Sequence, residues 1–121
     1  MRSYSRGVFG RQWERVEGEV LAEAVHRSHH TDDGTPYLRM KYVVGYQLAG
    51  AAPVRVELKE PERFGTKVIR SLTRGEVVPL LVDARSGKVR FDVDDPAINR
   101  KAARERARRR GDDDFRSALD D

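Results

Sequence analysis

The stretch YLRMKYVVGYQL, Tyr37 to Leu48, decides the fold. Its apolar side chains recur at every second position, as Leu38, Met40, Tyr42, Val44, Tyr46 and Leu48. Arg39 and Lys41 fall between them. Because successive side chains of a strand point to opposite faces, this alternation predicts a half-buried β-strand.

The same period continues on both sides of this stretch. In RVEGEVLAEAVHR the small apolar residues Val16, Val20, Ala22 and Ala24 alternate with glutamates. The turn residues Asp33, Gly34 and Pro36 then predict a hairpin loop. After the turn AGAAP, the segment VRVELK (54–59) places Val54, Val56 and Leu58 on one face. These segments therefore predict three neighbouring antiparallel strands.

Two more strands are predicted in EVVPLLVD (76–83) and GKVRFDV (87–93). Pro79 lies inside the first of them and favours an edge strand or a bulge. Between residues 60 and 75 the alternation stops, and KVIRSL (67–72) is compatible with one short helical turn. The sequence predicts a mainly β fold: a small five-stranded antiparallel barrel or curved sheet, OB-like or SH3-like, with a C-terminal charged helix.

DDPAINRKAARERARRRG reads as a helix with recognisable ends. Asp94 or Asp95 would cap it, Pro96 suits the first helical position, and Gly111 would end it. We expect Ile98 to dock only the first turns of this helix. The sequence therefore predicts four segments: a basic and aromatic N-terminal arm (1–12), a β domain (13–95), an Arg-rich helix (96–111) and an acidic disordered end (112–121).

Composition limits the class of protein. The chain has 121 residues, of which 36% are charged and 38% apolar, and it has no cysteine. Its net charge is +4 and its isoelectric point about 9.7, which favours an anionic partner without establishing one. No apolar run is long enough for a signal peptide or a membrane span, so we expect a soluble, cytoplasmic protein.

The Arg-rich helix is the first candidate contact surface. Its basic residues within one sector of the helix are Arg100, Lys101, Arg104 and Arg108. Like charges four residues apart oppose helix formation, so an anion such as a nucleic-acid backbone would stabilise the stripe. The alternative is a solvated tail in which Asp112, Asp113 and Asp114 neutralise the arginines.

The N-terminal arm is the second candidate. Its arginines, Arg2, Arg6 and Arg11, interleave with Tyr4, Phe9 and Trp13. Stacking aromatic residues beside cations are typical of proteins that hold single strands. In the alternative interpretation Phe9 and Trp13 cover one end of the β core and the arginines remain in solvent.

The outward face of the sheet and the histidine-containing loop can each be explained with or without a ligand. The outward face of the sheet carries Tyr37, Arg39, Lys41, Arg55 and Lys59, a basic platform that cross-strand glutamates would also explain. The three histidines, His26, His29 and His30, precede Asp32 and Asp33, but their spacing matches no metal-ligand motif, so we predict no metal site.

Catalytic motifs are not recognisable. No Gly-rich phosphate loop, nucleophile elbow or His-Glu-x-x-His motif occurs. RSLTR (Arg70 to Arg74) has the RxxxR form of PilZ domains, which bind cyclic di-GMP, but Asp83 to Gly87 lacks the internal spacing of their second motif. We therefore predict a non-enzymatic protein without a cofactor.

The segment LTRGEVVPLLVDARSGKVRFDVDDP (72–96) resembles a loose group of uncharacterised small β-domain proteins from high-GC bacteria. The β domains of this group commonly end with a Gly-containing turn, an apolar strand, Asp, a short turn and a final strand. The likeness covers about residues 13 to 95, implies the β fold and supplies no catalytic residues.

The sequence thus predicts a binding module. The first hypothesis is a nucleic-acid-binding accessory protein that uses the Arg-rich helix, with the N-terminal arginines as a possible addition. The alternative is a protein–protein adaptor or assembly protein that uses a sheet edge and the C-terminal tail. In that tail Phe115 and Leu119, four residues apart, would form a short docking helix.

Overall fold

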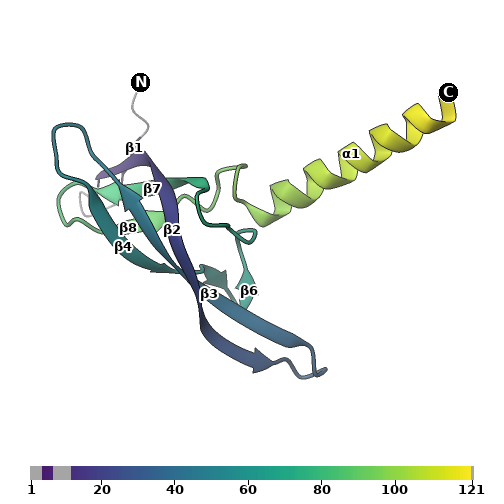
Figure 1. The fold of residues 1–121 in the computed structure, drawn as a ribbon, viewed down its shortest axis with the longest axis horizontal. Coiled ribbons are helices and arrows are strands. Elements are labelled where there is room, and N and C mark those ends of the chain that lie inside the picture. Colours follow the sequence, from purple (N-terminus) through teal and green to yellow (C-terminus); the bar gives the residue numbers. More distant parts are fainter. Residues whose placement is uncertain (1–3, 7–11, 121) are drawn as a thin grey trace.

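The computed structural model describes residues 4–6 and 12–120, a mainly β protein with one C-terminal helix (Figure 1). Five antiparallel strands follow the path β4 (Val54–Lys59), β3 (Pro36–Tyr46), β2 (Gln12–His30), β7 (Val77–Asp83) and β8 (Val89–Phe91). Strand β1 (Tyr4–Arg6) pairs with the start of β2. A separate two-stranded hairpin contains β5 (Glu62–Arg63) and β6 (Thr66–Lys67), and α1 spans Arg100–Asp120.

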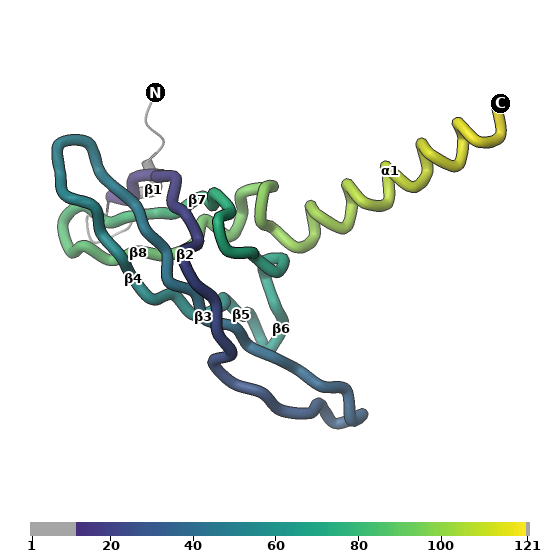
Figure 2. Tube along the Cα trace, viewed as in Figure 1, coloured from purple at the N-terminus to yellow at the C-terminus, as the bar shows by residue number. Residues whose placement is uncertain are grey.

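Strand β2 is long enough to serve two neighbours in succession. Its first half pairs with β7, and its second half pairs with β3. Beyond the core, the end of β2 and the start of β3 project as a two-stranded ribbon (Figure 2). Ala22 and Ala24, predicted to point inward, are exposed because they lie on this ribbon, after a register shift between Val20 and Ala22.

The core lies where β2, β3 and β7 meet the chain that follows β6. Its fully buried apolar side chains include Val20, Tyr42, Val44, Ile69, Val78, Leu80, Val82 and Ile98. The Tyr42 ring meets Phe91 edge to face, with ring centroids 6.0 Å apart. Ile69 and Ile98 come from outside the sheet, so they tie the connection and the approach to α1 into the same core.

The sheet curves but is not closed into a barrel. Its edge strands β4 and β8 approach each other, yet no hydrogen-bonded ladder joins them within the described part of the chain. A hollow of about 470 Å³ lies at this seam, lined in part by Leu58, Pro61, Val89 and Phe91. Of the two predicted forms, the structure has an open, curved sheet.

Pro79 does not mark an edge strand. Strand β7 lies between β2 and β8, and Pro79 pairs with Glu17. The carbonyl oxygen of Pro79 accepts a hydrogen bond from the Asp92 amide at 3.0 Å, just past the end of β8. The nitrogen of Pro79 faces the same side, beyond the last paired residue of β8, and the Asp92 carbonyl accepts from the Asp95 amide at 3.0 Å instead, so this position allows a proline in an interior strand.

The connection between β4 and β7 contains a hairpin where a helical turn was predicted. Glu62 pairs with Lys67, and Arg63 pairs with Thr66, across the two-residue turn Phe64-Gly65. Residues 68–72 form no helical turn, and Ile69 makes an isolated bridge to Asn99. Backbone hydrogen bonds from Arg70 to Ile98 and from Arg100 to Val68 pair this segment with the chain that leads into α1, in place of bonds within a helical turn.

Helix α1 differs from the predicted helix at both ends. Asp95 caps a preceding turn through the amide of Ala97, and the helix begins after Asn99, whose side-chain oxygen accepts from the amide of Ala102. At the other end, Gly111 does not stop the helix, and residues 112–120, predicted to be disordered, are helical. A single glycine costs a helix only about 1 kcal/mol, which the flanking residues can offset.

Within the described residues, α1 is too polar to cross a membrane, and no other helix is a candidate for a span.

Candidate functional site

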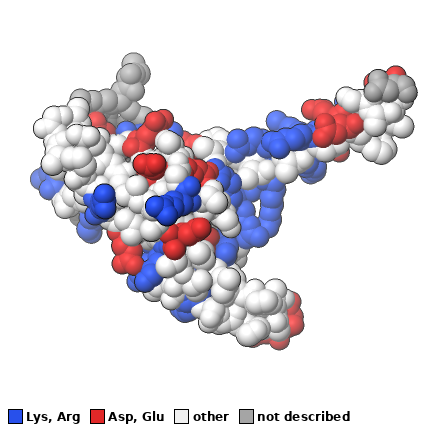
Figure 3. Space-filling model, viewed as in Figure 1, with Lys and Arg blue, Asp and Glu red and all other residues white. Residues whose placement is uncertain are grey.

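A basic hollow of about 340 Å³ lies between the β5–β6 hairpin and the first turns of α1. Among the described residues, its lining contains five basic ones and no acidic one; the basic residues are Arg63, Lys67, Arg100, Lys101 and Arg104. Phe64, Val68 and Asn99 complete much of the surface. In Figure 3 basic side chains gather along the half of α1 that is nearer the sheet, and acidic ones follow further out.

An ion-pair network beneath the hairpin fixes one wall of this hollow. The Glu62 carboxylate accepts a hydrogen bond from the Tyr37 hydroxyl. The other carboxylate oxygen lies 3.2 Å from Nε of Arg39 and 3.5 Å from Arg27. Because all three partners belong to the β2–β3 ribbon, the network anchors the hairpin to the sheet.

Glu60 and Lys67 form a second anchor. The Glu60 side chain is fully buried, and its Oε1 accepts from the Met40 amide at 3.1 Å and lies 3.4 Å from Nζ of Lys67. Lys67 also lies over the Tyr37 ring, 5.4 Å from its centroid. Glu60 and the Tyr37 ring therefore hold Lys67 in the wall, and its positive charge still adds to the basic character of the hollow.

The other wall, the start of α1, is joined to the hairpin by backbone bonds. The Arg100 amide donates to the Val68 carbonyl at 3.0 Å, and the Arg70 amide donates to the Ile98 carbonyl at 2.8 Å. The side-chain oxygen of Asn99 caps the helix by accepting from the Ala102 amide at 3.0 Å, and its side-chain nitrogen donates to the Val93 carbonyl at 2.9 Å. The two walls therefore have a fixed separation.

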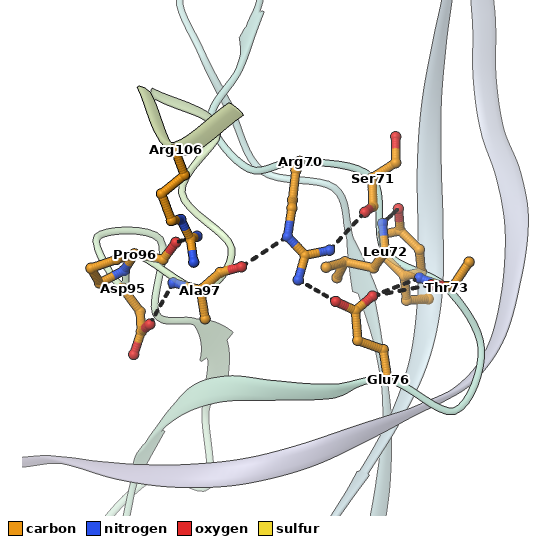
Figure 4. A network of polar contacts seen from close by, with 10 residues as sticks. Arg70, Ser71, Leu72, Thr73, Glu76, Asp95, Pro96, Ala97 and Arg106 are labelled. Atoms are coloured by element: carbon orange, nitrogen blue, oxygen red, sulfur yellow. Dashed lines mark hydrogen bonds and ion pairs between the residues drawn. The ribbon is translucent and has the colours of Figure 1, made fainter. Parts of the chain in front are cut away.

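Arg70 forms hydrogen bonds within the protein and does not line the hollow. Its guanidinium donates to the carbonyls of Ala97 and Ser71 and to the Glu76 carboxylate (Figure 4). Burial raises the pKa of Glu76, but bonds from Arg70 and Thr73 outweigh burial and hold this pKa below its ordinary value. These contacts explain the RSLTR segment without a nucleotide ligand.

Phe64 stands at the tip of the hairpin, at the rim of the hollow. Its side chain is 99% exposed and its φ is 55°, in the left-handed region that a bulky residue rarely occupies. Gly65 follows with φ 74°, so both central residues have the positive φ of a type I′ hairpin turn. An exposed aromatic ring is thus held in a strained position next to five cations.

Electrostatics favours an anion in the hollow. Within the described part of the chain, Arg63, Arg100, Lys101 and Arg104 have no ion-pair partner. Beneath them, burial and then the bond to Glu62 raise the pKa of Tyr37 to about 12, so its hydroxyl remains a donor at neutral pH. The acidic residues of the network are engaged with ribbon cations and Lys67, whereas Arg63, Lys101 and Arg104 are exposed to solvent and Arg100 is half-buried.

The structure brings together three of the predicted helix residues, Arg100, Lys101 and Arg104. Arg108 lies one turn further along the exposed helix, outside the hollow. In the N-terminal arm, Arg6 lies in β1, where its backbone pairs with Gln12, and Arg2 and Arg11 lie outside the described residues.

Trp13 and the predicted docking residues are also placed. Trp13 is only 6% exposed, but it faces the side of the sheet opposite Val16 and Leu80, where the Arg90 guanidinium lies 4.3 Å from its ring centroid. Phe115 and Leu119 are exposed on the last turns of α1 and have no covering element in the described chain.

Cross-strand ion pairs occupy much of the outward sheet face. Lys41 lies 3.5 Å from Glu57 of the neighbouring strand β4, and Arg39 contacts Glu62. In β2 the residue that pairs with Lys41 is Ala24, and the register of β2 against β3 shifts twice, between Val20 and Ala22 and between Val25 and Arg27.

The histidines lie at the exposed end of the β2–β3 ribbon. The ring of His29 packs against Tyr37, with centroids 4.8 Å apart. In the part of the chain that the structure describes, no three His, Asp or Glu side chains gather closely enough to hold a metal ion.

Sequence reasoning missed Arg63, Phe64 and Lys67. Their signal is the segment ERFGTK (62–67), in which a two-residue turn ending in glycine separates charged residues. Phenylalanine at the first turn position conceals this signal, because asparagine, aspartate or glycine is usual there.

No protein-family model, no curated protein and no solved structure matches this chain, so the likeness to small β-domain proteins stays a prediction.

Proposed function

We propose that this protein binds single-stranded nucleic acid in the basic hollow and is a binding module without enzymatic activity. The observation that carries the proposal is the fully exposed, strained Phe64 at the rim of a hollow lined by five basic residues. Cations that follow a phosphate backbone, together with an aromatic ring on which a base stacks, are the two elements of single-strand binding.

The conformation of Phe64 supports a role in contact with a ligand. A left-handed backbone costs a residue with a side chain about 1 kcal/mol or more, and asparagine at this position would reduce that cost. Full exposure of a phenyl ring gains no burial in the free protein. Both costs favour a ring that is covered only when a ligand is bound.

The cations supply the sequence-independent part of the affinity. Each phosphate contact releases condensed counterions, so binding weakens with salt in proportion to the number of contacts. The fixed separation of the hairpin and α1, through Val68 and Arg100, means that little ordering entropy is lost when a strand binds.

The choice of a single strand over a duplex follows from the aromatic tip. A base in a duplex is stacked on both faces, so its π-face is not accessible to Phe64 without unstacking. An unpaired base offers its face directly, and stacking on an aromatic side chain contributes about 1–3 kcal/mol.

The curved sheet serves, in this proposal, as OB-like and SH3-like domains do, as a rigid support for a surface next to it. The site proposed here differs from the usual OB surface, because it lies between the β5–β6 hairpin and α1 instead of on the sheet face. We place this activity in the cytoplasm, where single-stranded RNA is abundant.

The test is fluorescence anisotropy with a labelled oligouridylate and a labelled duplex of equal length, over a salt series. We expect the full chain to prefer the single strand. Arg63→Ala and Arg104→Ala should each reduce the salt slope by about 0.7, the value for one phosphate contact on a single strand. Arg116→Ala is the matched control, because it removes the same charge from the exposed, distal part of α1.

Phe64→Asn separates binding from folding. It replaces the ring with the residue that a type I′ turn prefers, so the free energy of unfolding should rise while binding weakens by about tenfold. Wild-type protein that binds neither probe at low salt, or binding that Arg63→Ala and Arg104→Ala leave unchanged, would refute the proposal.

A further inference from the structure

Helix α1 carries its charges in the order that destabilises a lone helix. Seven basic residues and one glutamate lie between Arg100 and Arg110, and three consecutive aspartates, Asp112 to Asp114, follow toward the C-terminus. The partial charge of a helix is positive at its N-terminus and negative at its C-terminus, so both halves carry the unfavourable sign. No acidic residue lies in the first turn and no basic one in the last.

Beyond its first turns, which contact the segment after β6, the helix is also unsupported by packing. None of its residues is buried, and Phe115 and Leu119 are 68% and 71% exposed. Gly111, at its centre, has open space where a Cβ would lie. Because most helical stability in proteins comes from packing of one face, a long helix of this kind gains from a partner that covers it.

One face of the helix is complementary to itself. Ala107, Gly111 and Phe115 form a row at i, i+4, with the small residues before the centre and the ring after it. At 100° per residue, Arg108 and Asp112 lie on one side of this row, and Arg110 and Asp114 lie on the other. Each side therefore carries one cation and one anion.

We propose that two copies of this chain associate through α1 as an antiparallel pair that crosses at Gly111. Twofold symmetry about Gly111 places Phe115 of each copy against Ala107 of the other. It also places Arg108 opposite Asp112 and Arg110 opposite Asp114, so four ion pairs flank the crossing. Aligning the two i, i+4 rows gives the commonest helix-packing class, with an interaxial angle of about −50°.

A second copy is the occupant that the charge pattern selects. An antiparallel copy sets the acidic half of one helix beside the basic half of the other and opposes the two helix dipoles. A nucleic acid would be repelled by the aspartates, and a wholly acidic protein would leave them unpaired. The inference does not rest on nucleic-acid binding, because neither Arg108 nor Arg110 lines the basic hollow.

The experiment is a charge-swap series on the full chain, measured by sedimentation velocity from low to high micromolar concentration. The first variant is Arg108→Asp with Arg110→Asp, and the second is Asp112→Arg with Asp114→Arg. Each variant alone places like charges opposite each other, so its dimer should dissociate with a constant at least about tenfold weaker than that of the wild type. An equimolar mixture rebuilds all four pairs and should recover the wild-type affinity as a heterodimer.

Two controls distinguish the interface from general effects of charge and of helix stability. Arg109→Asp with Asp113→Arg changes the same kinds of residue on the opposite face and should leave dimerisation unchanged. Gly111→Ala should raise the helix content seen by circular dichroism, whereas Gly111→Leu should raise it and still weaken the dimer. Wild-type protein that is monomeric throughout, or a mixture no tighter than its parts, would overturn the inference.

Discussion

The backbone amide of Arg100, the first residue of α1, donates a hydrogen bond of 3.0 Å to the carbonyl of Val68, directly after strand β6. This bond joins two segments that are more than thirty residues apart in the chain, and the adjacent bridge between Ile69 and Asn99 reinforces it. The hairpin with its aromatic tip and the helix with its cations consequently form one unit. A ligand in the hollow meets a surface that is already assembled.

Asn99 is the residue on which this junction depends most. Asn99→Ala removes the cap on Ala102 and the bond to the Val93 carbonyl, so we expect a loss of about 1–2 kcal/mol of unfolding free energy. Urea denaturation measures this loss.

Asn99→Asp is the control, since a carboxylate keeps the cap while it cannot donate to Val93. It should recover most of the helix content and part of the stability. If Asn99→Ala were as stable as the wild type, the described start of α1 would not depend on this cap.

Lys67 and Glu60 give a second prediction. Lys67→Met leaves the buried Glu60 carboxylate without its cation and should destabilise the protein by about 3 kcal/mol. The double variant Lys67→Met, Glu60→Gln removes the charge as well and should recover much of this loss. A double-mutant cycle by urea denaturation checks the sign, and equal costs for the single and double variants would contradict it.

The strands of the central sheet could be predicted from the sequence because alternation reports burial of one face. Val44 and Val82 illustrate this, since both lie in strands predicted from their pattern and both are buried. The pattern fails where a strand continues past the core. Ala22 and Ala24 keep the alternation on the ribbon, but they are exposed there, and no other element of the described chain covers them.

The site could be predicted only in part, for a different reason. The cations of α1 form a pattern within one element, whereas their relation to Arg63 depends on the Val68–Arg100 bond, which no local pattern encodes. From the sequence Gly111 predicts a helix end, because a glycine cap and an interior glycine have the same appearance in sequence. The choice between them depends on the whole helix and on what covers it.

Gly18 gives a third prediction, about packing in the sheet. A Cβ at this position would lie 2.5 Å from Cδ1 of Leu80 and 2.9 Å from Cγ1 of Val44, both in the core. Gly18→Ala should therefore cost about 1–3 kcal/mol, although alanine is otherwise the better strand residue.

The matched comparison for Gly18 is a compensating change. Leu80→Val shortens the side chain that the new methyl of Gly18→Ala meets. The double variant should therefore lose less unfolding free energy than the two single variants lose in sum. Additive costs in urea denaturation would show that Leu80 is not the obstacle.

Asp92 and Asp95 face the same guanidinium and should have opposite effects on pH-dependent stability. Arg15 lies 2.7 Å from Asp95 and 3.8 Å from Asp92. The Ala97 amide and then Arg15 lower the pKa of Asp95, whereas burial and then the charge of Asp95 raise the pKa of Asp92. A lowered folded-state pKa stabilises the protein above the unfolded-state value, and this contribution disappears as pH falls through the folded-state value.

Asp95→Asn should therefore cost about 1 kcal/mol at pH 7, and the cost should fade below about pH 4 as the wild-type carboxyl protonates. Asparagine can still accept from Ala97, so the difference isolates the charge. Asp92→Asn should instead stabilise the protein at pH 7, because the raised pKa means that ionised Asp92 opposes folding there. This gain should also vanish in acid. Urea denaturation of the three proteins from pH 7 to pH 3 measures both trends, and a cost for Asp92→Asn at pH 7 would show that its pairing with Arg15 outweighs burial.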